Sequence, residues 1–265
     1  MLTKQEFQNW FGSVERLYHY TSFESAVRIL DSGYILFSDL CRMNDINESY
    51  RTVYWEITGD PVFPKDSFWT HYRQLSLTQD GSHDGYNIPS MWGHYADRGN
   101  GVCFVFDKNL LLTQAPNGKY FHHDEVDYDC EYNGDIMLSP GDYNSIHRQL
   151  WEDNIKDVFF IKTEDWEHEQ EYRIIQYSKQ ITKFKSLQIG SSLIAVIMLY
   201  DQKKNQSIFG SYEDRMLHKV NPCLTLLELW RYIDGEYILK SRENKKYWPT
   251  DNCKWSLDSD YLKMQ

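Results

Sequence analysis

Two kinds of hydrophobic spacing alternate along the chain, and they predict strands and helices in close succession. Short runs that alternate apolar and polar residues, or that are apolar throughout, are typical of strands. The most apolar run, LIAVIMLY, has the length of a buried strand. On this basis strands are predicted at residues 17–21, 34–37, 74–78, 102–106, 172–177 and 193–200.

Helical spacing separates several of these strands. Ser22 is placed to cap a helix that Gly33 would end, and Pro89 suits the first turn of another helix that carries Met91, Trp92 and Tyr95. Three further segments also have helical spacing, namely residues 3–14, 64–74 and 143–161.

The first strand, helix and strand all lie within residues 17–37. An ordinary parallel crossover unit needs about thirty residues or more, so this segment is too short to form one. We therefore expect the chain to turn around a cleft at this point.

Chain length allows one large domain or two small ones. We expect a single α+β domain over residues 1–265, with a core at about residues 17–200 and a C-terminal extension at residues 201–265. Within the extension, Asp234–Gly235 lies between two apolar runs, which predicts a β-hairpin.

The segment Lys162–Tyr177, KTEDWEHEQEYRIIQY, joins an acidic half to a strand-like half. Side chains two apart on a strand share a face, so Glu169 and Glu171 would lie side by side with Arg173 next along. Neighbouring carboxylates raise the pKa of one member, which favours acid–base chemistry. The alternative is a solvated strand edge with an incidental ladder of charges.

Composition excludes several classes of protein. The net charge is −11 without any basic block, which disfavours stable non-specific binding to nucleic acid. The 5 cysteines form no CxxC pair, so they indicate a reducing cytoplasm rather than a disulfide framework or a zinc ribbon. No run approaches the roughly 18 apolar residues that a membrane span needs. These features predict a cytoplasmic protein.

Motifs for metal and phosphate chemistry are missing from the sequence. Neither a Walker loop nor GxGxxG occurs, and no pair of histidines has the spacing of a zinc helix. His122 and His123 are neighbours on a predicted strand, so their side chains would diverge. No metal site is predicted.

Four blocks of sequence resemble one bacterial family. They are LYHYTSFES…ILDSGYILFS, RMNDINE, SLTQD…MWGHYADRGNGVCFVFD and KTEDWEHEQEYRII. In order and spacing these blocks resemble the family known as domain of unknown function 2971, over roughly residues 17–200. One departure is Met43-Asn44-Asp45-Ile46, where the family usually has a Phe-Asn-Asp-Pro turn.

A more distant resemblance is to the ADP-ribosyltransferase-like superfamily. His19-Tyr20-Thr21-Ser22 is similar to its opening motif, either Ser76 or Tyr95 would fill its middle position, and Glu171 would be its later Glu. The resemblance implies an α+β fold with a split, bent mixed β-sheet flanked by helices. It also implies NAD as co-substrate.

The resemblance assigns a role to each candidate residue. Glu171 would hold the ribose 2′-hydroxyl and stabilise an oxocarbenium-like state, and Glu169 would align or deprotonate the acceptor. His19 would hold the adenosine-side ribose, and Arg173 or Arg42 would bind phosphate oxygens. The other expected site residues are Tyr20, Thr21, Ser76, Tyr95, Asn44, Asp45 and Glu48, with Trp92 and Trp166 as supports.

The acceptor implied by the resemblance is a protein, a nucleic acid or water, and small bacterial transferases of this type are often toxins or anti-phage effectors. Two other functions remain open. The first is a non-catalytic module that binds a nucleotide or a partner, with its carboxylates paired to Arg173 and Lys162. The second is a nuclease that holds magnesium with Asp45, Glu48, Glu169 and Glu171.

Overall fold

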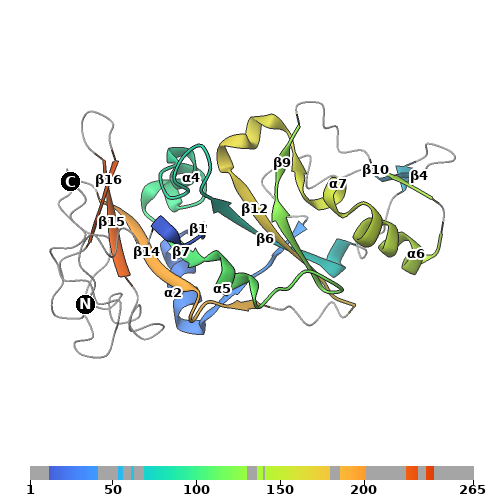
Figure 1. The fold of residues 1–265 in the computed structure, drawn as a ribbon, viewed down its shortest axis with the longest axis horizontal. Coiled ribbons are helices and arrows are strands. Elements are labelled where there is room, and N and C mark those ends of the chain that lie inside the picture. The colour runs from blue at the N-terminus through green and yellow to red at the C-terminus, as the bar shows by residue number, and fades with distance from the viewer. Residues whose placement is uncertain are drawn as a thin grey trace. The chain divides into compact units, whose positions relative to one another are not determined.

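Strand β1 (Arg16–Thr21) lies inside the largest sheet and pairs antiparallel with β7 (Val102–Asp107) along its whole length. In turn, β7 pairs antiparallel with β14 (Leu193–Tyr200). The sheet continues from β14 to β15 (Thr225–Arg231), which runs parallel to it, and to β16 (Tyr237–Ser241), which is antiparallel to β15. Figure 1 shows β1, β7 and β14 side by side.

The computed structural model describes nine stretches of the chain, and these fall into two compact units. Whether the two units make one domain, as expected, stays a prediction. Unit 1 comprises Met1–Ile35, Leu77–Gln114 and Leu187–Gln265, and unit 2 comprises Leu36–Ser76 and Ala115–Ser186. The described residues are 12–40, 53–55, 61–62, 69–129, 136–139, 141–179, 186–200, 225–231 and 237–241.

Helix α2 (Phe23–Ser32) follows β1 and begins and ends where the sequence predicts. The Ser22 hydroxyl accepts a bond from the Ser25 N–H, and Gly33 ends the helix in the left-handed conformation with φ 74°. That conformation strains a residue that has a Cβ, which is why glycine suits the position. The chain then continues into β2 (Tyr34–Leu36), which pairs with β13 (Ser186–Gln188).

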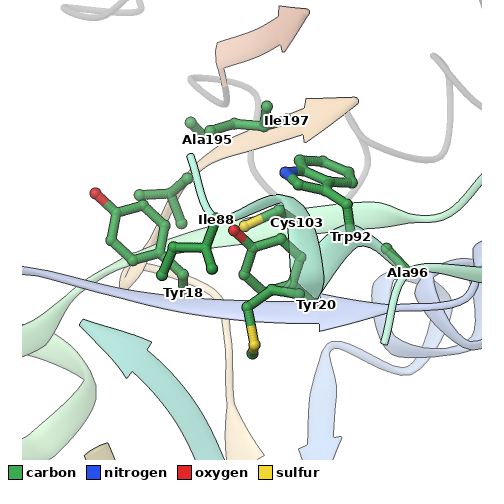
Figure 2. Packing of buried hydrophobic residues seen from close by; sticks show 10 residues of the cluster. Tyr18, Tyr20, Ile88, Trp92, Ala96, Cys103, Ala195 and Ile197 are labelled. Atoms are coloured by element: carbon green, nitrogen blue, oxygen red, sulfur yellow. The ribbon is translucent and has the colours of Figure 1, made fainter. Parts of the chain in front are cut away.

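Helix α4 (Pro89–His94) packs against β1 and β7 in the core of unit 1. The rings of Tyr20 and Trp92 meet edge to face, with centroids 5.2 Å apart. Figure 2 shows both rings beside Ala96 and Cys103. Unit 1 also contains two short helices, η3 (Asp97–Gly99) and α5 (Lys108–Leu112).

Unit 2 contains a second set of strands. Strand β12 (Glu171–Tyr177) pairs antiparallel with β8 (Phe121–Glu125) and neighbours β6 (Tyr72–Gln79). The last residues of β6 belong to unit 1 and pair with β1. The shorter strands of unit 2 are β3 (Ser38–Asp39), β4 (Val53–Trp55), β5 (Pro61–Val62), β9 (Asp127–Tyr128), β10 (Ile136–Leu138) and β11 (Ile161–Lys162).

An aromatic core covers one face of β12. Ile175 and Tyr177 pack with Tyr72 of β6 and with Trp151 and Phe159, which come from helical segments. Alternation along β12 places Glu171 and Arg173 on this same face. The helical segments of unit 2 are η2 (Trp69–His71), α6 (Tyr143–Arg148), the π-helical turn η4 (Gln149–Asp153), α7 (Ile155–Phe159) and η5 (Glu164–Glu169).

The single helix predicted at residues 143–161 is wrong, because α6 ends at Arg148 and a π-helical turn separates it from α7. Asn154, which has φ −123° and ψ 24°, interrupts the helix, and its side-chain amide donates to the Gln149 carbonyl. Asparagine competes in this way for backbone groups that a helix would use.

The structure confirms a mixed α+β protein with a mainly antiparallel sheet flanked by helices. Most of the predicted helix at residues 3–14 and the Asp234–Gly235 turn lie outside the described residues. Strands β15 and β16 pair on either side of that turn. Among the described residues, no helix is long and apolar enough to span a membrane.

Candidate functional site

Strand β12 places Glu171 and Arg173 on one buried face. The run from Tyr172 to Tyr177 favours a strand because β-branched and aromatic residues fit a pleated surface. Glu171 begins the strand, and its backbone N–H donates to the Tyr128 hydroxyl at 2.8 Å. Glu171 is 4% exposed and Arg173 is fully buried. Both charged side chains therefore need partners inside the protein.

The Arg173 guanidinium binds the Glu171 carboxylate through two of its nitrogens. Its Nε donates to Oε1 at 2.8 Å, and its Nη2 donates to Oε2 at 2.8 Å. The remaining Nη1 donates to the Phe159 carbonyl at 2.6 Å. This bidentate geometry is the strong form of an arginine–carboxylate pair. Arg173 is thus held firmly at both ends of its guanidinium.

Lys162 of β11 joins the two acidic residues. Its Nζ donates to Glu169 Oε2 at 2.7 Å and to Glu171 Oε2 at 3.3 Å. The ammonium also lies 4.4 Å from the centroid of the Trp166 ring, a distance at which cation–π attraction acts. Lys162 and Glu169 are 4% and 3% exposed, so this pair is buried as well.

Two polar side chains of β6 complete the cluster. The Gln74 amide donates to the Ser76 hydroxyl at 2.9 Å and to Glu171 Oε1 at 3.5 Å. The Ser76 hydroxyl also lies close enough to the Glu171 carboxylate to help lower its pKa. Ser76 is exposed, whereas Gln74 is buried. The cluster thus includes one exposed polar residue, Ser76, on the strand beside the buried carboxylate.

We refer to Lys162, Glu169, Glu171 and Arg173, with Gln74 and Ser76, as the acid cluster. Its two carboxylates are balanced by two cations, so the four charges sum to zero. Burial alone would raise the pKa of Glu171, but Arg173, Lys162 and the Ser76 hydroxyl outweigh it and lower the pKa to about 2. The expectation of a raised pKa is wrong for Glu171, because the cations lie closer to it than the sequence alone could show.

Glu169 reaches the cluster by a different route from the one predicted. It is the last residue of η5, not a residue of β12, and Gln170 lies between the two acids in the left-handed conformation with φ 47°. The side chains therefore do not share a face by strand alternation, yet both carboxylates meet at Lys162. The alternative of a solvated strand edge is wrong too, because both acids are buried.

The sequence pointed to neither Gln74 nor Tyr128. Gln74 was recoverable, since it is two residues before Ser76 on a predicted strand and therefore shares its face. Tyr128 binds a backbone group 43 residues away, and no local pattern signals such a contact. Lys162 was predicted only as an ion-pair partner in the binding alternative.

The other predicted site residues that the structure describes lie in unit 1. His19 is half-buried on β1, with its backbone opposite Phe104, and Thr21 is buried at the end of the strand. The Tyr20 hydroxyl donates to the Gly85 carbonyl at 2.6 Å, and the Trp92 indole donates to the Tyr86 carbonyl at 2.9 Å.

Tyr95 packs, partly buried, against the same core as Tyr20 and Trp92. Contact of any of these residues with NAD stays a prediction. So does the meeting of His19, in unit 1, with Glu171, in unit 2, at one ligand.

Four predicted residues lie outside the described part of the chain, namely Arg42, Asn44, Asp45 and Glu48. Two of them, Asp45 and Glu48, belong to the proposed magnesium set of a nuclease. Within the described residues, no group of three or more His, Cys, Asp and Glu side chains is arranged to hold a metal ion.

Comparison with known proteins supports the family resemblance. Residues 91–174 match the model of a family described as "Protein of unknown function (DUF2971)". The matched range includes Lys162, Glu169, Glu171 and Arg173, the four charged residues of the acid cluster. No curated protein matches the chain, and no solved structure does.

Proposed function

We propose that this protein is an ADP-ribosyltransferase-like enzyme that consumes NAD and transfers ADP-ribose to a protein or nucleic-acid acceptor. The observation that supports this most is that the Gln74 amide joins the exposed Ser76 to the carboxylate of the buried Glu171. The resemblance calls for a Ser or Tyr in the middle block and a Glu on a later strand. Ser76 is close to that carboxylate within unit 2, which supports Ser76 as the middle residue.

The charge of Glu171 suits the proposed chemistry. Nicotinamide leaves the ribose through an oxocarbenium-like state, which a carboxylate bonded to the 2-hydroxyl stabilises. With a pKa of about 2, Glu171 is ionised throughout the physiological range. Its role is therefore to present negative charge and to accept a hydrogen bond, rather than to carry a proton.

Glu169 would serve the acceptor. Its carboxylate shares Lys162 with Glu171, which keeps the two acids close to one another. A nucleophile held beside Glu169 would thus lie near the ribose carbon that Glu171 stabilises. His19 and Thr21 would contact the adenosine side of NAD, as the resemblance implies.

The cost of the buried charges also supports a functional site. Replacing a buried ion pair with apolar residues is often neutral or stabilising, so such a pair is weak evidence for a purely structural role. Here four charged side chains are buried together in one cluster. A buried carboxylate whose pKa is strongly shifted by specific charged partners, as that of Glu171 is, is a candidate for function.

The test is release of nicotinamide and transfer of label from NAD labelled in its adenylate part, in the presence of a cell lysate. Wild type is expected to do both, and Glu171→Gln is expected to lose about a hundredfold or more of the rate, because a charged transition state loses its partner. Glu167→Gln is the matched control, since Glu167 is an exposed residue of η5.

Absence of both activities in wild type contradicts the proposal. So does an unchanged rate in Glu171→Gln, provided that the variant is folded by circular dichroism. Ser76→Ala serves as a second variant, because it removes the hydroxyl and leaves every buried charge paired.

One observation favours a second candidate, a non-catalytic module that binds a nucleotide. Arg173 and Lys162 already occupy both oxygens of Glu171. Under this function ADP-ribose and NAD would raise the melting temperature by mass action, without release of nicotinamide. Turnover of NAD separates the two functions directly.

A further inference from the structure

We propose that Lys162 is a positioning residue that gives up Glu171 Oε2 to a ribose hydroxyl when the ligand binds, while it keeps its bond to Glu169. This inference rests on the proposed function, because it takes the acid cluster as the site for NAD. The ligand class is a nucleoside diphosphate linked to a ribose. The proposal rests on the different ways in which the two cations, Arg173 and Lys162, bind Glu171.

Arg173 cannot be the cation that moves. Its guanidinium binds both oxygens of Glu171 at 2.8 Å and the Phe159 carbonyl at 2.6 Å. Arg173 is fully buried, so separating it from Glu171 would leave its positive charge away from water and without this carboxylate. An uncompensated buried charge is strongly destabilising. Arg173 thus fixes the carboxylate in place.

Of the two contacts that the Lys162 ammonium makes with the acids, the one with Glu171 is the weaker. It measures 3.3 Å, against 2.7 Å from the same ammonium to Glu169. Lysine carries its charge on a flexible four-carbon stem, so a small rotation shifts the ammonium without moving the backbone. The backbone of Lys162 is itself held, since its carbonyl accepts a bond from the Asp129 N–H at 3.0 Å.

Opening the cluster at this contact leaves every charge with a partner. Lys162 would remain on Glu169, and Glu171 would remain on Arg173. A neutral hydroxyl can then take the freed position on Oε2 at little electrostatic cost, because it adds no charge. The Trp166 ring, 4.4 Å from the ammonium, would go on attracting Lys162 by cation–π interaction.

The other groups around the two acids are consistent with a mobile Lys162 and a fixed Arg173. Among the described residues, ionisable side chains near the two acids include Lys162, Arg173 and the Tyr128 hydroxyl, and burial raises the pKa of Tyr128. Tyr128 therefore stays neutral and cannot replace Lys162 as a cation. Within the described cluster, Lys162 and Arg173 supply the positive charge.

A pair of variants at residue 162 tests the proposal through the Michaelis constant for NAD. Lys162→Met removes the competitor for Oε2, and Lys162→Arg holds the same oxygen with a rigid guanidinium fork. We expect KM to fall about fivefold in the first and to rise about fivefold in the second, equivalent to one hydrogen bond of about 1 kcal/mol. A merely structural role would move KM in the same direction in both variants.

Shifts of KM in one direction, or none, while wild type releases nicotinamide, overturn this inference and leave the proposed function intact. If wild type binds ADP-ribose but releases no nicotinamide, the proposed function fails. The inference is then judged by the same opposite shifts in Kd, measured by calorimetry. Absence of both binding and turnover in wild type overturns both.

Lys162→Met leaves Glu169 without its cation, which can prevent folding. The double variant Lys162→Met/Glu169→Gln removes both charges of that pair and leaves Glu171 with Arg173. The proposal predicts that it binds ADP-ribose more tightly than Glu169→Gln alone. Weaker or equal binding contradicts it.

Discussion

Glu171 owes its ionised state to the residues around it. Burial favours its neutral form, and the Arg173 guanidinium and the Lys162 ammonium reverse that preference. A carboxyl whose folded pKa is depressed from 4.5 to about 2 contributes stability that is fully present above pH 4.5 and is lost as the pH falls toward 2. The ion pairs of Glu171 should therefore stay intact throughout the physiological pH range.

Replacing Glu171 by Gln should lower the free energy of unfolding at pH 7 by about 3–5 kcal/mol, because one partner of a buried ion pair is removed. Glu167→Gln, an exposed change nearby in sequence, should stay within about 0.5 kcal/mol of wild type. Urea denaturation measures both. Equal stabilities of the two variants would mean that the buried pair contributes nothing to the fold.

His147 predicts a second, separate pH dependence. Its ring stacks on Tyr177 with centroids 3.7 Å apart, and its Nδ1 is bonded to the Tyr72 hydroxyl. Burial, and then the nearby Lys179 and His71, lower its pKa from 6.5 to about 4. The unfolded chain thus binds a proton at a higher pH than the folded chain does.

Stability should be constant with respect to His147 above pH 6.5 and should fall as the pH drops from 6.5 toward 4. His122, whose pKa burial also lowers, contributes in the same direction. His147→Gln should flatten part of this slope in unfolding free energies measured at a series of pH values. Identical slopes in wild type and variant would show that His147 does not titrate in this way.

Among the elements, α4 and the turn after it offer a matched pair of glycines. Gly93 is an exposed helical residue with open space where a Cβ would lie, whereas a Cβ on Gly101 would overlap the Thr21 carbonyl oxygen. Gly93→Ala should stabilise the protein by up to about 1 kcal/mol, since alanine favours helix.

Gly101→Ala should instead destabilise the protein by about 1–3 kcal/mol, because the backbone of β1 or of the turn must shift. Thermal unfolding of both variants checks the pair. Two shifts of the same sign would contradict this account of the turn. The Gly101 change also lies next to Thr21, so it would disturb the end of β1 that carries His19.

Local pattern was a good guide to the strands and to α2, whereas the helix predicted at residues 64–74 is wrong where it is described, since a short 3₁₀ turn there leads into β6 at Tyr72. The runs that became β1, β7, β12 and β14 are apolar and β-branched enough to predict from sequence, and Ser22 and Gly33 mark both ends of α2. The interruption at Asn154 was harder to predict, because Gln149, whose carbonyl accepts from the Asn154 amide, also bonds the backbone of Ser139 ten residues earlier. Such long-range bonds leave no periodic signal.

The arrangement of the acid cluster was also predictable from the sequence only in part. Strand alternation correctly placed Glu171 and Arg173 on one face. The place of Glu169 depends on a left-handed Gln170, a conformation that non-glycine residues adopt rarely. The contacts of Lys162 and Gln74 join separate strands, so only the folded chain brings them together.

At the scale of the whole molecule, unit 2 is assembled from two separate pieces of chain. Residues 115–186 supply β8 and β12, and residues 36–76 supply the part of β6 that carries Tyr72, Gln74 and Ser76. A fragment of residues 115–186 alone should not fold, because β12 would lose this neighbour and its buried charges would be exposed. A well-dispersed amide spectrum of the fragment would contradict this.

We propose that Glu171, in the acid cluster, holds the ribose of NAD, and a crystal structure of the wild-type chain with ADP-ribose is the sharpest test. We expect a ribose hydroxyl within about 3 Å of Glu171 Oε2, Lys162 bonded to Glu169 alone of the two acids, and His19 on the same ligand. ADP-ribose bound elsewhere, with both cations still on Glu171, would contradict it.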